Sequence, residues 1–151
     1  RVKMAKAVIR LKYLSLICLI LSSLSLLKIE NAGLCVMGYY EQGIVTYFKD
    51  MKGSGGSDDP AVFGAAAYMG LLFSLFFLFP LTKPWFIGLF SSLLLVQFLI
   101  FALVDIPLND IVYDSVKYCQ NDWMLAWLIL EFLFILCSVL LIRTMKYLDE
   151  E

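Results

Sequence analysis

The chain of 151 residues contains no histidine. Imidazole is the usual general base of hydrolytic triads and a common ligand of haem and of catalytic zinc, so those sites are excluded in their usual forms. No two of the four cysteines have the Cys-x-x-Cys spacing of a structural zinc site. We therefore expect no metal, no cofactor and no enzymatic activity.

Phosphate-binding and nucleic-acid-binding patterns are missing as well. The glycines of residues 53–56 are followed by acids and lack the lysine that a P-loop requires. The basic residues mostly flank apolar stretches and form no basic face on the outside. We expect no nucleic-acid partner.

Long apolar runs are what the chain has instead. Its hydrophobic content is 62% and its mean hydropathy is +0.85. The hydrocarbon core of a bilayer is about 30 Å across and needs roughly 20 apolar helical residues. Four stretches meet this length: residues 8–27, 61–79, 85–104 and 123–142. The sequence predicts an all-α membrane protein, in which residues 1–151 form a single four-helix transmembrane bundle embedded in the lipid bilayer.

The connections between these stretches are unequal in length. Residues 80–84 form a tight turn bounded by two prolines, whereas the connections over residues 28–60 and 105–122 are long. Residues 33–49 combine β-branched and aromatic side chains with glycines, which is typical of a small β-hairpin. An irregular segment on the membrane surface is the alternative.

The basic residues indicate the orientation. Of the twelve, five lie before the first stretch or in its first five residues, one lies in the tight turn and two follow the last stretch. Because positive charge is retained on the cytoplasmic side, we expect both termini there and the two long connections outside. This orientation suits a multi-pass protein of the plasma membrane or of the secretory pathway.

The first stretch also fits the pattern of a secretory signal peptide, with basic residues before an apolar run. We interpret it as a retained span and expect Met4 to be the initiator, which leaves the origin of residues 1–3 open.

The four cysteines fall into two pairs. Cys35 and Cys119 lie in the two outer connections, whereas Cys18 and Cys137 lie inside apolar stretches. Exposed thiols pair in an oxidising compartment, so we favour a disulfide between Cys35 and Cys119, worth on the order of 4 kcal/mol. The alternatives are that both stay free, or that Cys35 pairs between chains. The two intramembrane cysteines are expected to be packing residues.

Three polar residues lie at membrane depth. Glu131 is about 12 Å below the outer boundary, and Gln97 and Tyr68 are each about 10 Å below it. We expect these three to form one intramembrane polar layer. It would act either as an interhelical clamp or partner contact, or as an ion or proton site.

Small residues mark a helix-packing face in the second stretch: Gly64, Ala66, Ala67 and Gly70. Small residues let transmembrane helices approach closely. The face can pack within the bundle or against another subunit.

The plan of four spans, a larger first outer connection and a minimal inner turn resembles the claudin-like and MARVEL-type tetraspan proteins. Residues 33–35, Gly-Leu-Cys, are similar to part of the Gly-Leu-Trp…Cys signature of the first claudin loop. That loop has no tryptophan here and has one cysteine instead of two. The resemblance implies a left-handed bundle with a small outer β-element that acts in adhesion, in barriers or as an auxiliary channel subunit.

The functional expectation is a non-enzymatic tetraspan protein that binds other membrane proteins, as an auxiliary subunit or as a junction or adhesion component. Its partners would form a larger complex, or a homo-oligomer of this chain. The first alternative is a pore-forming or transport subunit for cations that uses Glu131 and an acidic outer rim. The second is a small membrane enzyme or a lipid-handling protein.

Overall fold

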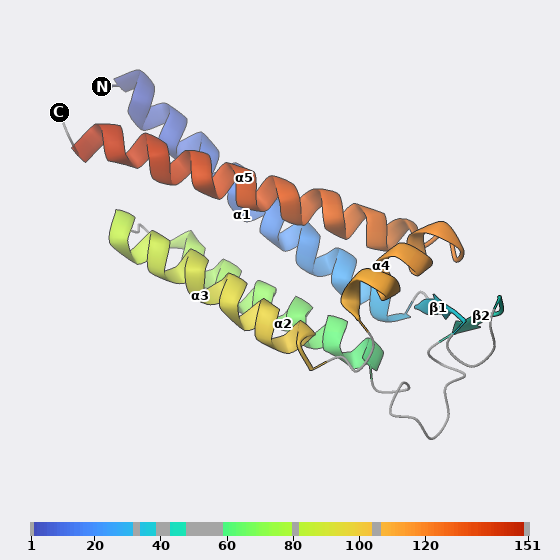
Figure 1. Ribbon diagram of the computed structural model, residues 1–151. Coiled ribbons are helices and arrows are strands. Elements are labelled where there is room, and N and C mark those ends of the chain that lie inside the picture. The colour runs from blue at the N-terminus through green and yellow to red at the C-terminus, as the bar shows by residue number, and fades with distance from the viewer. Residues whose placement is uncertain are drawn as a thin grey trace.

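A computed structural model describes residues 2–31, 34–38, 43–47, 59–79, 82–103 and 107–149. Its elements are α1 (Val2–Asn31), β1 (Cys35–Met37), β2 (Val45–Tyr47), α2 (Asp59–Leu78), α3 (Lys83–Phe101), α4 (Leu108–Lys117) and α5 (Asp122–Asp149). The start of α1 and the end of α5 lie at one end of the molecule, and the strands lie at the other (Figure 1). We call these ends the terminal side and the sheet side.

Four of the helices among the described residues are long and apolar enough to cross a membrane, which confirms the predicted fold class. The apolar windows are Lys6–Ile29, Pro60–Leu78, Lys83–Phe101 and Asp122–Met145. Helix α1 runs to Asn31, so the first connection begins later than predicted. Helix α3 ends at Phe101, and Val104, the predicted end of that span, lies outside the described residues.

Helix α1 is the centre of the arrangement. It packs along both α5 and α2, whereas α3 packs mainly against α2 and touches α5 little. Helices α1 and α5 therefore form one antiparallel pair and α2 and α3 form another (Figure 1). The two helices that are farthest apart in the chain lie side by side.

The sheet side carries the predicted β-element. Strands β1 and β2 pair antiparallel, with Val36 opposite Thr46. The amide of Gly38 donates a hydrogen bond of 2.9 Å to the carbonyl of Ile44. Gly38 and Gly43 have φ angles of 79° and 85°, a left-handed conformation that glycine adopts without steric cost. Of the two predictions for this segment, the hairpin is confirmed.

A fifth helix, α4, lies in the second long connection, where no element was predicted. It begins after Pro107 and packs against β1 and α5. Its apolar positions Leu108, Ile111, Val112 and Val116 recur at helical spacing and pack into the sheet-side part of the bundle. The connection is therefore a folded cap.

Two separate apolar cores fill the bundle. The sheet-side core is made of residues from α1, α2, α4 and α5, from β1 and from the residue before β1: Leu26, Ile29, Leu34, Val36, Phe63, Ala66, Ala67, Ile111, Met124 and Trp127. The terminal-side core is made of residues from α1, α2, α3 and α5: Leu16, Cys18, Leu19, Phe77, Phe86, Phe90, Leu93, Phe134 and Leu141. What lies between these cores is polar.

Candidate functional site

Polar side chains from three helices meet between the two cores. The hydroxyl of Ser22 on α1 donates a hydrogen bond to Oε2 of Glu131 on α5. Gln97 on α3 and Trp127, one turn before Glu131, also interact with this carboxyl group. Within the described residues, Oε1 of Glu131 and Nε1 of Trp127 have no partner with good hydrogen-bond geometry. We call Ser22, Gln97, Trp127 and Glu131 the polar layer.

The polar layer links residues of α1, α3 and α5. The bond from Ser22 to Glu131 joins residues 109 positions apart in the chain. Gln97, which is 6% exposed, brings α3 to the same carboxyl group. Because hydrocarbon offers no competing water, such bonds favour one arrangement of the helices. Oε1 remains able to accept one further donor.

Tyr68, the third predicted member of the layer, does not belong to it. Its side chain is 65% exposed on the outside of the bundle. Depth along a helix gives the height of a residue but not its direction, and successive residues point about 100° apart. Helix α2 turns Ala67 and Gly70 inward, which leaves Tyr68 facing away. Ser22 occupies the place in the layer that was predicted for Tyr68.

The packing face of α2 lies within the bundle. Gly64, Ala66, Ala67 and Gly70 are all buried. A Cβ atom at Gly70 would collide with Oγ of Ser23 on α1 and would lie 3.3 Å from its Cβ. Gly70 therefore sets the close approach of α1 and α2, and this face is not free for another subunit.

The seam between α1 and α5 continues the polar pattern towards the terminal side. The hydroxyl groups of Ser15 and Ser138 are hydrogen-bonded at 2.7 Å and are buried. Cys18 and Cys137 are free, buried thiols in the same part of the seam. The serines were not singled out in the sequence, although their recurrence in an otherwise apolar stretch was the available signal.

Aromatic rings close the polar layer from both sides. On the sheet side the ring of Phe101 lies 5.3 Å from Phe63 and 5.5 Å from Trp127. On the terminal side the ring centroids of Phe90 and Phe134 are 5.6 Å apart, and Phe77 packs on Phe86 at 5.2 Å. Along the described part of the bundle, the polar layer is thus bounded by packed rings.

The sheet side ends in a covalently closed cap. Cys35 and Cys119 form a disulfide across 84 residues of sequence, as predicted. The amide of Met37 donates to Oδ2 of Asp114 at 2.7 Å. The hydroxyl of Ser115 lies 3.3 Å from both the amide nitrogen and the carbonyl oxygen of Cys35. Asp114 and Ser115, which sequence reasoning missed, fix α4 on β1.

Comparison with known proteins identifies no family for this chain. No family model, no curated protein and no solved structure matches the chain. Within the described residues, no group of three or more Cys, Asp or Glu side chains is placed to hold a metal ion. The claudin-like resemblance therefore stays a prediction.

Proposed function

We propose that this protein is a non-enzymatic tetraspan membrane protein that binds other membrane proteins, as an auxiliary subunit or as a junction component. The observation that carries the proposal is the outward face of α2. Tyr68 is 65% exposed there, about 13 Å along the helix from its start at Asp59. Its hydroxyl group makes no hydrogen bond to any described residue.

The neighbours of Tyr68 favour a helix over lipid as its partner. Ala61 and Ala65 are exposed on the same stripe of α2, at intervals of four and three residues. Small residues allow a second helix to approach closely, and a tyrosine hydroxyl can then bond across the contact. Lipid tails offer such a hydroxyl no partner. Helix α2 thus combines an inward face for α1 with an outward face for another protein.

The exposure of α3 also favours a protein partner at the α2–α3 pair. Only 22% of its apolar window is buried, against 39% for α2. It packs mainly against α2 and contacts α5 little. A partner helix can therefore contact the α2–α3 pair without displacing α1 or α5.

The disulfide supports the proposed orientation. Disulfides persist in oxidising compartments, so we place the sheet side outside or in the lumen and both termini in the cytoplasm. The membrane would be the plasma membrane or one of the secretory pathway. Single cysteines at Lys83 and Ile44, in a background with Cys18 and Cys137 replaced, test this. Only position 44 should react with an impermeant maleimide applied to intact cells, and labelling at position 83 would refute the orientation.

Photo-crosslinking in native membranes tests the partner. Benzoylphenylalanine at Tyr68 should give a discrete adduct with another membrane protein. Phe132 on α5 is the matched control, because it is 64% exposed, aromatic and at a similar depth. Adducts at both positions, or at neither, would contradict the assignment of the α2 face.

A cation-conducting subunit is the second candidate, because Glu131 presents an unpartnered Oε1 at membrane depth. The rings of Phe101 and Phe134 on either side of the layer weigh against a pore through one chain. Conductance of the purified protein in a planar bilayer distinguishes the two. A current that depends on Glu131 would favour the second candidate.

A further inference from the structure

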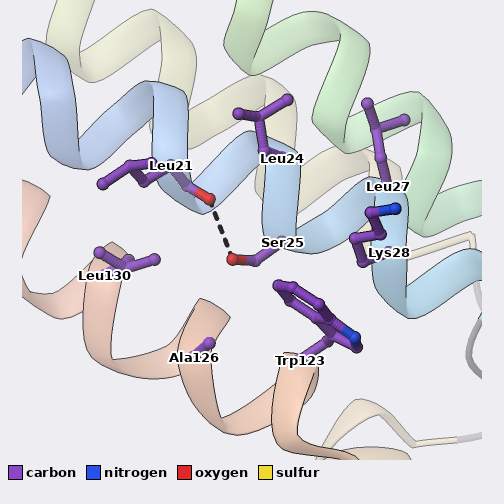
Figure 2. A pocket seen from close by; sticks show the side chains of 8 residues that line it. All are labelled: Leu21, Leu24, Ser25, Leu27, Lys28, Trp123, Ala126 and Leu130. Atoms are coloured by element: carbon purple, nitrogen blue, oxygen red, sulfur yellow. Dashed lines mark hydrogen bonds between the residues drawn. The ribbon is translucent and has the colours of Figure 1, made fainter.

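A groove lies in the sheet-side half of the contact between α1 and α5, beyond the hydrogen-bonded pair of Ser15 and Ser138. Its volume is about 610 Å³, within the range of about 300–1,000 Å³ that is typical of small-molecule sites. Leu21, Ser25 and Lys28 of α1 face Trp123, Ala126 and Leu130 of α5 across it (Figure 2). The small side chains of Ser25 and Ala126 leave the space between the helices open.

The walls of the groove are apolar. Leu21 and Leu130 line its deeper part, and Ala126 lies between Leu130 and Trp123. The one hydroxyl in it, that of Ser25, donates its hydrogen to the carbonyl of Leu21 at 2.9 Å and is thereby satisfied (Figure 2). The groove therefore suits a hydrocarbon chain and offers little to a polar molecule.

The sheet-side end of the groove carries one basic and one aromatic side chain. Lys28 and Trp123 flank this end (Figure 2). Asp122 precedes Trp123 and is exposed at the start of α5, but it does not line the groove. Lysine binds phosphate as a point charge, and an indole ring binds quaternary ammonium groups through its face. This end lies where the bilayer headgroups are, since it coincides with the ends of two spans.

We infer that the groove between α1 and α5 binds one zwitterionic phospholipid of the sheet-side leaflet. An acyl chain lies along Leu21, Ala126 and Leu130, and the phosphate contacts Lys28. The headgroup ammonium contacts the ring of Trp123. The site would make the protein a binder of a defined lipid, independently of any protein partner.

A second lysine on the sheet side provides the comparison. Lys117 lines a smaller groove of about 470 Å³ between α4 and α5. Its ammonium group donates to the hydroxyl of Tyr113 at 2.6 Å and lies 5.1 Å from the ring of Tyr118. The hydrogen bonds to Tyr113 and Tyr118 raise the pKa of Lys117. Because this ammonium is already held by the protein, we assign the phospholipid to Lys28.

Native mass spectrometry of the purified protein with added phosphatidylcholine tests the headgroup contact. Lys28→Gln should weaken retention of the lipid about fivefold, the effect expected for one lysine at a membrane surface. Lys117→Gln removes the same charge on the same side and should leave retention unchanged. Equal losses in the two variants, or no loss with Lys28→Gln, would overturn the site.

Two further comparisons test the groove and the choice of lipid. Ala126→Phe should fill the groove and abolish retention, while Ala65→Phe adds the same side chain to an exposed position of α2 and should not. Wild-type protein should retain phosphatidylcholine better than diacylglycerol, which lacks phosphate, and better than anionic phosphatidylglycerol. Equal retention of diacylglycerol would refute the phosphate contact, and stronger retention of phosphatidylglycerol would refute the zwitterionic headgroup. Formation of the Cys35–Cys119 disulfide checks that each variant is folded.

Discussion

The α1–α5 pair and the α2–α3 pair are held together by different means. The α1–α5 seam uses hydrogen bonds between buried polar groups, such as Ser15 to Ser138 across 123 residues of sequence. The α2–α3 pair uses aromatic contacts, such as Phe77 on Phe86 at 5.2 Å. A short connection already keeps α2 and α3 together, whereas α1 and α5 have most of the chain between them.

The difference follows from the weak driving force that lipid provides for the association of apolar helices. Burying apolar surface gains little when the solvent is itself apolar, so distant helices need hydrogen bonds or close backbone approach to find one another. The α1–α5 seam has Ser22 and Glu131 at mid-depth and the cap with its disulfide at the sheet side. The order of the helices therefore depends mainly on α1 and on what it contacts.

The largest expected effect comes from opening the cap. Replacing both Cys35 and Cys119 by serine should lower the free energy of unfolding by about 4 kcal/mol, since the disulfide closes a long loop. Unfolding in mixed detergent and dodecyl sulfate micelles measures the change. Replacing Cys18 and Cys137 by alanine is the control, and we expect a clearly smaller loss there. Equal losses would mean that the cap does not hold the α1–α5 pair.

The next effect concerns the junction between the two pairs. Gly70→Val should cost about 1–3 kcal/mol, because its side chain would displace Ser23 and push α2 away from α1. Gly88→Val on α3 is a matched control, since nothing lies within 4 Å of a Cβ there. Thermal unfolding in detergent should separate the two variants. A destabilised Gly88 variant together with an unaffected Gly70 variant would contradict the role of Gly70 in the close approach of α1 and α2.

The smallest effect concerns the polar layer. Glu131→Leu removes the acceptor of Ser22 and should cost about 0.6–2 kcal/mol. Glu131→Gln keeps an acceptor and removes the charge, so assembly and stability should be nearly unchanged. Both are measured by the same unfolding assay, together with conductance. A wild-type current that Glu131→Gln abolishes, with assembly intact, would show an ion site instead of a clamp.

The spans, the hairpin and the disulfide could be predicted because each depends on the local sequence or on elimination. Hydropathy marks a span without knowledge of its neighbours, and Cys35 and Cys119 were the only thiols outside the apolar stretches. Glu131 and Gln97 were placed at one depth from their distances to the ends of the spans. The structure brings both to the polar layer.

Direction around a helix and the order of the helices could not be read in this way. Tyr68 has the depth of the layer but faces outward, because Gly70 decides which side of α2 meets α1. Ser22 was overlooked because serine is common in transmembrane helices and gains its meaning only opposite Glu131. Helix α4 is different, since the spacing of Ile111, Val112 and Val116 already carried the signal.

The unequal lengths of the two helix pairs have a consequence for the membrane itself. The apolar windows of α1 and α5 are 24 residues long, whereas those of α2 and α3 have 19. At 1.5 Å per residue the two pairs match bilayer thicknesses of about 36 Å and about 28 Å. A bilayer that matches α2 and α3 is too thin for the full windows of α1 and α5, unless these two helices tilt or their charged end residues, such as Lys6 and Arg143, reach into the headgroups, at a fraction of a kcal/mol per ångström of mismatch. Because bilayer thickness increases from the endoplasmic reticulum to the plasma membrane, we expect this difference in length to influence which membrane holds the protein most stably.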